Sequence, residues 1–79
     1  MTRSDHQIAA AFYRQRGRHH ARNSLHLKRE LRANEWFLHP DAIECLKDEI
    51  TAQRMMAYEA FAQAAKDEQA AVRESRRAA

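Results

Sequence analysis

The sequence predicts an all-α protein: an antiparallel helical hairpin of two long helices that packs with a second copy as a dimeric four-helix bundle. Its 79 residues include one glycine and one proline, which leaves few turns, and good helix formers fill most other positions. The proline stands near the middle of the chain, between two stretches of helical periodicity. A chain this short buries little apolar surface alone, so we expect a homodimer or a higher homo-oligomer.

The first helix is predicted over about residues 5–35. Ser4 and Gln7 have the spacing of a capping box, in which each side chain bonds the backbone N–H of the other residue. Gly17 and Asn23 are its weak points. Glycine costs about 1 kcal/mol relative to alanine in a helix interior, and asparagine offers a second N-cap. The sequence leaves open whether the helix is continuous or kinked at one of these two positions.

The second helix is predicted to begin at Pro40, within the stretch FLHPDAIECL. Proline suits the first helical position because its missing N–H has no partner there, and it biases the preceding His39 away from helical dihedrals. Leu38 and Ile43 have the spacing of a hydrophobic staple across this helix start.

This helix is expected to run to about residue 74, followed by a frayed C-terminus. A turn of only about residues 36–39 forces the two helices to lie antiparallel. Residues 1–79 then form a single helical-hairpin domain.

Two stripes of residues predict the seam between the helices. On the first helix the stripe is spaced alternately by four and three, and His20 on it is expected to hydrogen-bond across the bundle. Adjacent Met55 and Met56 are expected to fill gaps in the bundle. The residues expected in the core or in self-association are Tyr13, Leu27, Leu31, Leu38, Ile43, Leu46, Ile50, Ala57, Phe61 and Ala64, and Val72 ends the second stripe.

Charge is distributed unevenly. Residues 1–39 carry a net charge of +5, and residues 40–79 carry −2. On a continuous helix five arginines fall within a sector of about 80°, roughly opposite the seam, and a leucine and a tryptophan interrupt them: Arg14, Arg18, Arg22, Arg29 and Arg32. Arginine, tryptophan and large apolar residues are typical of the centres of protein interfaces, although an ordinary solvated face is also rich in arginine. The candidate partner-binding residues are Arg14, Arg18, Arg22, Leu25, Arg29, Arg32 and Trp36.

The chemistry of catalysis and of metal binding is missing from the sequence. His19 and His26 share a helix face but stand about 10 Å apart, too far to hold one ion, and Cys45 has no partner cysteine. No phosphate-binding loop or nucleophile motif is present. We therefore expect no enzyme activity, no cofactor and no metal. No apolar run is long enough for a membrane span, so we expect a cytoplasmic protein with no membrane partner.

These features favour a small helical protein that binds a partner protein with an acidic surface, and that blocks or adapts it. Inhibitors and regulators of this kind occur among the accessory proteins of mobile elements. The alternative is a nucleic-acid-binding accessory protein that uses the basic first helix. It ranks second because no zinc-finger spacing, RNA-binding strand pattern or helix-turn-helix accompanies the arginines.

Overall fold

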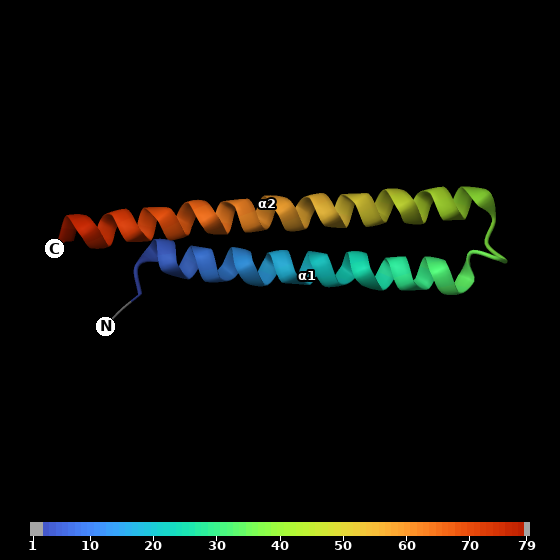
Figure 1. Ribbon diagram of the computed structural model, residues 1–79, viewed down its shortest axis with the longest axis horizontal. Helices are drawn as coiled ribbons and strands as arrows, with labels where there is room; N and C mark the ends of the chain where they lie inside the picture. The colour runs from blue at the N-terminus through green and yellow to red at the C-terminus, as the bar shows by residue number, and fades with distance from the viewer. Residues whose placement is uncertain (1–2, 79) are drawn as a thin grey trace.

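The computed structural model describes residues 3–78, which form an all-helical hairpin. Helix α1 spans Asp5–Asn34 and helix α2 spans Pro40–Ala78, and the two lie antiparallel (Figure 1). The predicted all-α hairpin is confirmed. Helix α2 continues past its expected end near residue 74, and the pairing of two hairpins remains a prediction.

Helix α1 begins at the predicted capping box. The Ser4 hydroxyl accepts from the Gln7 backbone N–H at 3.2 Å, and the Gln7 side-chain oxygen accepts from the Ser4 N–H at 3.0 Å. The helix then continues for 30 residues through both weak points. The Asn23 side chain contacts the His19 ring one turn earlier, at 3.3 Å. Neither Gly17 nor Asn23 interrupts the helix.

The turn between the helices uses ordinary backbone conformations. No residue in the described range has a positive φ, so the reversal needs no glycine. The backbone N–H groups of Phe37 and Leu38 both donate to the carbonyl of Asn34, at 3.1 and 3.2 Å. These bonds satisfy an exposed carbonyl at the end of α1.

His39 caps the start of α2 with its ring. Its Nδ1 accepts a hydrogen bond from the Asp41 backbone N–H at 3.1 Å, the role that a serine or aspartate usually fills. Leu38 and Ile43 are both half-buried on either side of this cap, as a hydrophobic staple requires. The proline was a correct signal for the helix start, and the imidazole cap is an addition that the sequence did not predict.

The seam between the helices is built mostly from small side chains. Among residues 3–78, Ile50 is the only buried apolar side chain larger than alanine. The other buried residues of this range are Ala10, Gly17, Ser24, Ala57, Ala60, Ala64 and Asp67. Small side chains let two helices approach closely, but each one removes little apolar surface from water.

Gly17 lies directly against the ring of Phe61 on the facing helix. A methyl group at this position would lie 2.8 Å from Cε1 of Phe61, with two more ring atoms at 2.9 Å. These distances are well below van der Waals contact. The single glycine of the chain therefore makes room for an aromatic ring of the facing helix.

Polar contacts across the seam fix the register of the hairpin. His20 Nδ1 lies 2.7 Å from the side-chain oxygen of Gln53, at a partly buried position. The Gln53 amide nitrogen donates to Glu49 at 3.1 Å, which turns the amide oxygen toward the ring, so Nδ1–H is the donor. Thus the expected hydrogen bond of His20 forms within one hairpin.

A second polar contact closes the open end of the hairpin. His6 Nδ1 donates to Asp67 Oδ1 at 3.1 Å, and His6 Nε2 lies 3.3 Å from Glu74. The bond from His6 holds the pKa of Asp67 below its ordinary value, and a bond from Gln63 acts in the same direction, whereas burial opposes both. The ionised carboxylate is therefore the form that this seam position stabilises.

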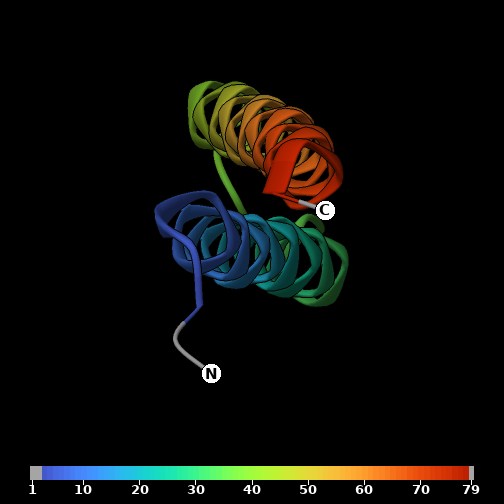
Figure 2. The ribbon, with the colours of Figure 1, turned by 90° about the vertical axis from the view of Figure 1, so that its left-hand side faces the viewer.

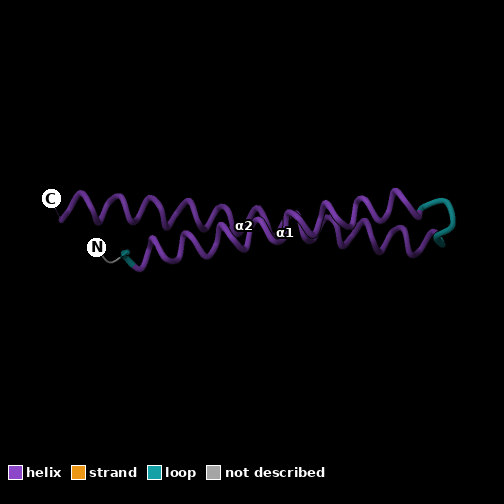
Figure 3. Tube along the Cα trace, turned by 90° about the horizontal axis from the view of Figure 1, so that it is seen from below, coloured by secondary structure: helices purple, strands orange, loops and turns teal. Residues whose placement is uncertain are grey.

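The hairpin is a single layer. Its backbone extends 62 × 18 × 12 Å, and its radius of gyration of 17.9 Å exceeds the value of about 12 Å expected for a compact chain of this length. The view along the rod shows that no other segment of residues 3–78 covers either side of the helix pair (Figure 2). The view from below shows that the two helices cross at a small angle (Figure 3). Both broad faces are exposed in the single chain.

The contact between Gly17 and Phe61 predicts a non-additive mutant cycle. Gly17→Ala should not stabilise the protein, although alanine is better than glycine in a helix by about 1 kcal/mol, because its methyl group meets the ring. In a Phe61→Ala background the same change should stabilise by about 1 kcal/mol. Urea unfolding of the four proteins measures both steps. Equal effects of Gly17→Ala in the two backgrounds would show that the ring does not require the glycine.

The lowered pKa of Asp67 predicts a pH-dependent effect of Asp67→Asn. A carboxyl with a lowered folded-state pKa stabilises the fold above its unfolded-state pKa of about 3.9, and this stabilisation is lost as the pH falls through the folded-state value. The variant should therefore be less stable than the native protein at neutral pH, with the difference shrinking below about pH 4. Urea unfolding between pH 2 and pH 7 tests this, with Asp48→Asn, an exposed carboxylate of the same helix, as the control. A difference that stays constant with pH would contradict the assignment.

Candidate partner-binding surface

The predicted arginines lie on two sides of α1. All five are exposed, and at 100° per residue Arg22 and Arg29 point nearly opposite the seam. The edge of α1, toward one broad face of the hairpin, instead carries Arg14, Arg18, Leu25 and Arg32. The predicted stripe therefore divides into an edge that can act together with α2 and a back that cannot.

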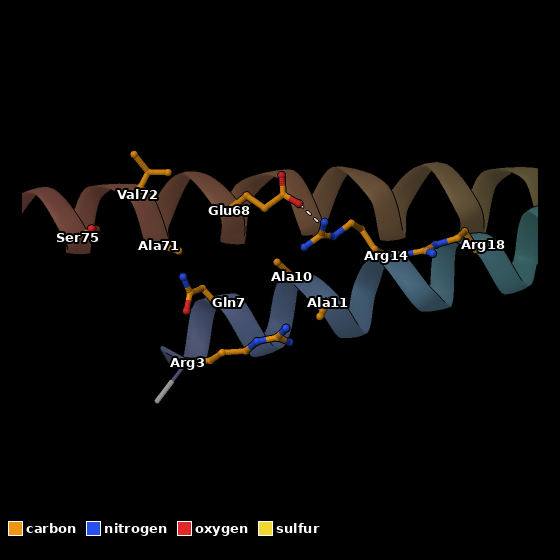
Figure 4. Close-up of a pocket in the computed structure, with 10 residues that line it drawn as sticks. All are labelled: Arg3, Gln7, Ala10, Ala11, Arg14, Arg18, Glu68, Ala71, Val72 and Ser75. Carbon is orange, nitrogen blue, oxygen red and sulfur yellow. Dashed lines mark ion pairs between the residues drawn. The ribbon is translucent and has the colours of Figure 1, made fainter. Parts of the chain in front are cut away.

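Arg14 reaches across to α2. Its Nε donates to Glu68 Oε1 at 3.1 Å, and both side chains are 49% exposed (Figure 4). An exposed pair of this kind contributes at most about 1 kcal/mol, and the guanidinium keeps other N–H donors for a ligand. None of the ion pairs within residues 3–78 includes Arg18, Arg22, Arg29 or Arg32.

Helix α2 contributes further residues to the broad face beside this edge of α1, and the sequence did not predict them as partner-binding residues. A shallow groove beside the seam is lined by Ala21, Ser24, Arg54, Ala57, Tyr58 and Phe61. Ala21 falls three residues after Arg18 and four before Leu25, which places the groove on the same broad face as this edge. We call this surface the basic face and define it by Arg14, Arg18, Leu25, Arg54, Tyr58 and Phe61.

The basic face combines positive charge with exposed apolar side chains. Leu25 is 48% exposed and Tyr58 is 68% exposed, between arginines contributed by both helices. Farther along, Val72 and the alanines at positions 10, 11 and 71 line a wider groove with Arg14 and Arg18 (Figure 4). A wheel of one helix cannot show such a surface, because half of it comes from the other helix.

Trp36 does not continue the arginine stripe. Helix α1 ends at Asn34, so the tryptophan lies in the turn, where it is 81% exposed. Its ring meets the Phe37 ring edge-on, with centroids 4.7 Å apart and planes at 75°. The sequence did not single out Phe37. These two rings form an exposed aromatic pair at the tip of the hairpin, separate from the basic face.

The residues expected in the core or in self-association differ in how far they are buried in the single hairpin. Ile50, Ala57 and Ala64 are buried, and Phe61 stands at the edge of the seam, 39% exposed. Val72 is 50% exposed, and the hairpin leaves Met55 and Met56 at 57% and 44%. Tyr13, Leu27, Leu31, Leu38, Ile43 and Leu46 are half-buried. Large apolar side chains thus lie at the edges of the seam, beside its alanines.

The opposite broad face carries a different surface. Its notch is lined by Tyr13, Arg16, His20, Met56, Glu59, Ala60 and Gln63. Phe12 stands beside the notch with its ring edge-on to Tyr13, 5.3 Å between centroids, and it is 55% exposed. We call this surface the mixed face, because it carries both signs of charge beside apolar side chains.

The described part of the chain offers surfaces and no clustered chemistry. Within residues 3–78, no three His, Cys, Asp or Glu side chains come together in a way that could hold a metal ion. Cys45 is exposed and has no neighbouring thiol. Neither α1 nor α2 contains, over the same residues, an apolar stretch that could cross a bilayer.

Comparison of the chain with models of protein families, with curated proteins and with solved structures finds no match. Its surfaces therefore carry the functional argument by themselves.

Proposed function

We propose that this protein is a non-enzymatic helical binding protein that self-associates and that binds a partner protein with an acidic surface. In this role it blocks or adapts its partner in the cytoplasm, as inhibitors and regulators of the mobile-element type do. The observation that carries the proposal is the basic face, where arginines from both helices surround exposed leucine, tyrosine and phenylalanine side chains.

This combination suits a protein partner better than a solvated surface. A face that only maintains solubility has no need of exposed Leu25 and Tyr58, since exposed apolar patches promote association. Arginine and tyrosine are also the side chains that most often dominate binding energy at the centre of an interface. The positive charge specifies an acidic partner and accelerates its approach.

Nucleic acid is the second candidate. The net charge of +5 on α1 favours it, because arginines along one helix can each neutralise a phosphate. The apolar side chains of the basic face favour a protein instead. The two candidates differ in which arginines matter, since phosphate binding is spread evenly over cations and protein binding concentrates in a few residues.

The test compares arginines on the basic face with arginines on the back of α1. Tagged protein captures its partner from lysate of the source cells, with and without nuclease treatment, and the Kd of each variant for that partner is then measured. Arg18→Ala and Leu25→Ala should each weaken binding by about 30-fold, or about 2 kcal/mol. The matched controls Arg22→Ala and Arg29→Ala should change it less than about threefold.

Two outcomes would contradict a protein partner. Capture that disappears on nuclease treatment would be one of them. The other is sub-micromolar binding to duplex DNA or RNA at physiological salt that the three arginine variants weaken equally, with a linear log–log dependence on salt. No effect of any variant on capture would show that the basic face is only solvated surface.

A further inference from the structure

The two broad faces of the hairpin differ in charge, and this difference determines which kind of partner each face can bind. The basic face carries Arg14, Arg18 and Arg54 against the single carboxylate of Glu68, which Arg14 already engages. Two copies meeting through this face would bring arginines against arginines. The mixed face has no such barrier, because Arg16 and Glu59 line the same notch.

The mixed face also exposes the apolar side chains that a dimer needs. Phe12, beside the notch, is 55% exposed, and Met56, which lines it, is 44% exposed. The Phe12 ring meets the ring of Tyr13, which lines the notch. The single-layer hairpin buries only one apolar side chain larger than alanine in its described range, so covering these side chains adds the core that it lacks.

We propose that a second copy of this chain binds the mixed face, with the two-fold axis along the long axis of the hairpin and both turns at the same end. This inference rests on the self-association in the proposed function and specifies its face and its direction. It leaves the basic face of each copy open on the outside of the bundle, where a partner can reach it.

The direction follows from the charges on the two helices. Two hairpins that meet through the same face have a two-fold axis either along the rod or across it. An axis along the rod lays α1, with a net charge of +5, on α2 of the other copy, with −2. An axis across the rod lays α1 on α1 and α2 on α2, so that helices of like net charge are paired.

One pair of residues makes this argument specific. Arg16 and Glu59 line the same notch, so they lie at the same height along the hairpin. An axis along the rod keeps heights unchanged, and Arg16 of each copy then faces Glu59 of the other copy. Within the described residues, the ion pairs of a single hairpin include neither side chain. The dimer therefore contains this pair twice.

Charge reversal tests the pairing. Arg16→Glu and Glu59→Arg should each weaken the homodimer by about tenfold or more, because each places two like-charged pairs in the interface. An equimolar mixture of these two variants should restore the native Kd, since the mixed dimer again holds two opposite-charge pairs. Sedimentation equilibrium measures all three samples. Restoration in the mixture identifies contacts between copies, because each variant chain carries two like charges at these positions.

The single cysteine provides an independent measurement of direction. A spin label on Cys45, near the turn, should give a distance between copies within about 30 Å when the turns lie at the same end. Turns at opposite ends would separate the labels by roughly 40 Å or more at 1.5 Å per helical residue. A Cys45→Ser, Ser75→Cys variant repeats the measurement at the open end, and short distances are expected there too.

The outcomes separate this inference from the proposed function. A monomer at high micromolar concentration would overturn both the self-association and this inference. A native dimer with long label distances, or without restoration in the mixture, would overturn the direction and the face proposed for it and leave self-association standing. Retained helicity of Arg16→Glu and Glu59→Arg by circular dichroism shows that weakened association is not caused by misfolding.

Discussion

The hairpin depends on the close approach of its two helices along a seam of small side chains. Gly17 accommodates the ring of Phe61, and alanines fill most of the remaining buried positions. Burying a methyl group contributes about 0.8 kcal/mol, whereas fixing the backbone of one residue costs about 1–2 kcal/mol. A seam of this kind positions the helices accurately, but it does not provide the apolar burial of a larger core. Polar contacts such as the hydrogen bond between His20 and Gln53 fix the register of the two helices more than they stabilise the fold.

The same constraint explains why large apolar side chains remain outside the seam. Close helices leave no room between them for Phe12, Met56 or Tyr58, so these side chains stand on the two broad faces. Charge then distinguishes the faces. A face with arginines from both helices suits an acidic protein, and a face with both signs of charge suits a second copy. In the proposed assembly one thin hairpin carries two interfaces that do not compete.

Much of the fold could be predicted from local signals. The capping box at Ser4, the proline at residue 40 and the alternating spacing of the α1 stripe all act over a few residues, and the structure contains each of them. The seam of α2 was harder to predict, because hydrophobicity selects Phe61 and Val72, which are exposed, and passes over Ala60 and Asp67, which are buried. Asp67 can be buried because His6, 61 residues away, donates to it, and a contact so distant in sequence leaves no local pattern.

The candidate site was also predicted only in part, because half of it depends on contacts between residues distant in sequence. The arginines of α1 were visible in the sequence, but Arg54 and Tyr58 join them only through the register of the hairpin. Trp36 was assigned to the arginine sector by extending the helical wheel past the helix end predicted near residue 35. The turn begins just before it, where carbonyls of the last helical turn accept from the N–H groups of the following residues. Helix ends are set by such terminal bonds, which short-range propensity does not determine.

The central claim is that one hairpin buries too little to be stable alone and that a second copy completes its core. The concentration dependence of thermal unfolding tests it most directly, because association stabilises the fold by mass action. Helicity followed by circular dichroism between about 1 and 100 µM should show a Tm that rises by several degrees over this range, with a dimer mass by light scattering below the transition. A cooperative transition at the same Tm throughout, with a monomer mass, would contradict the account.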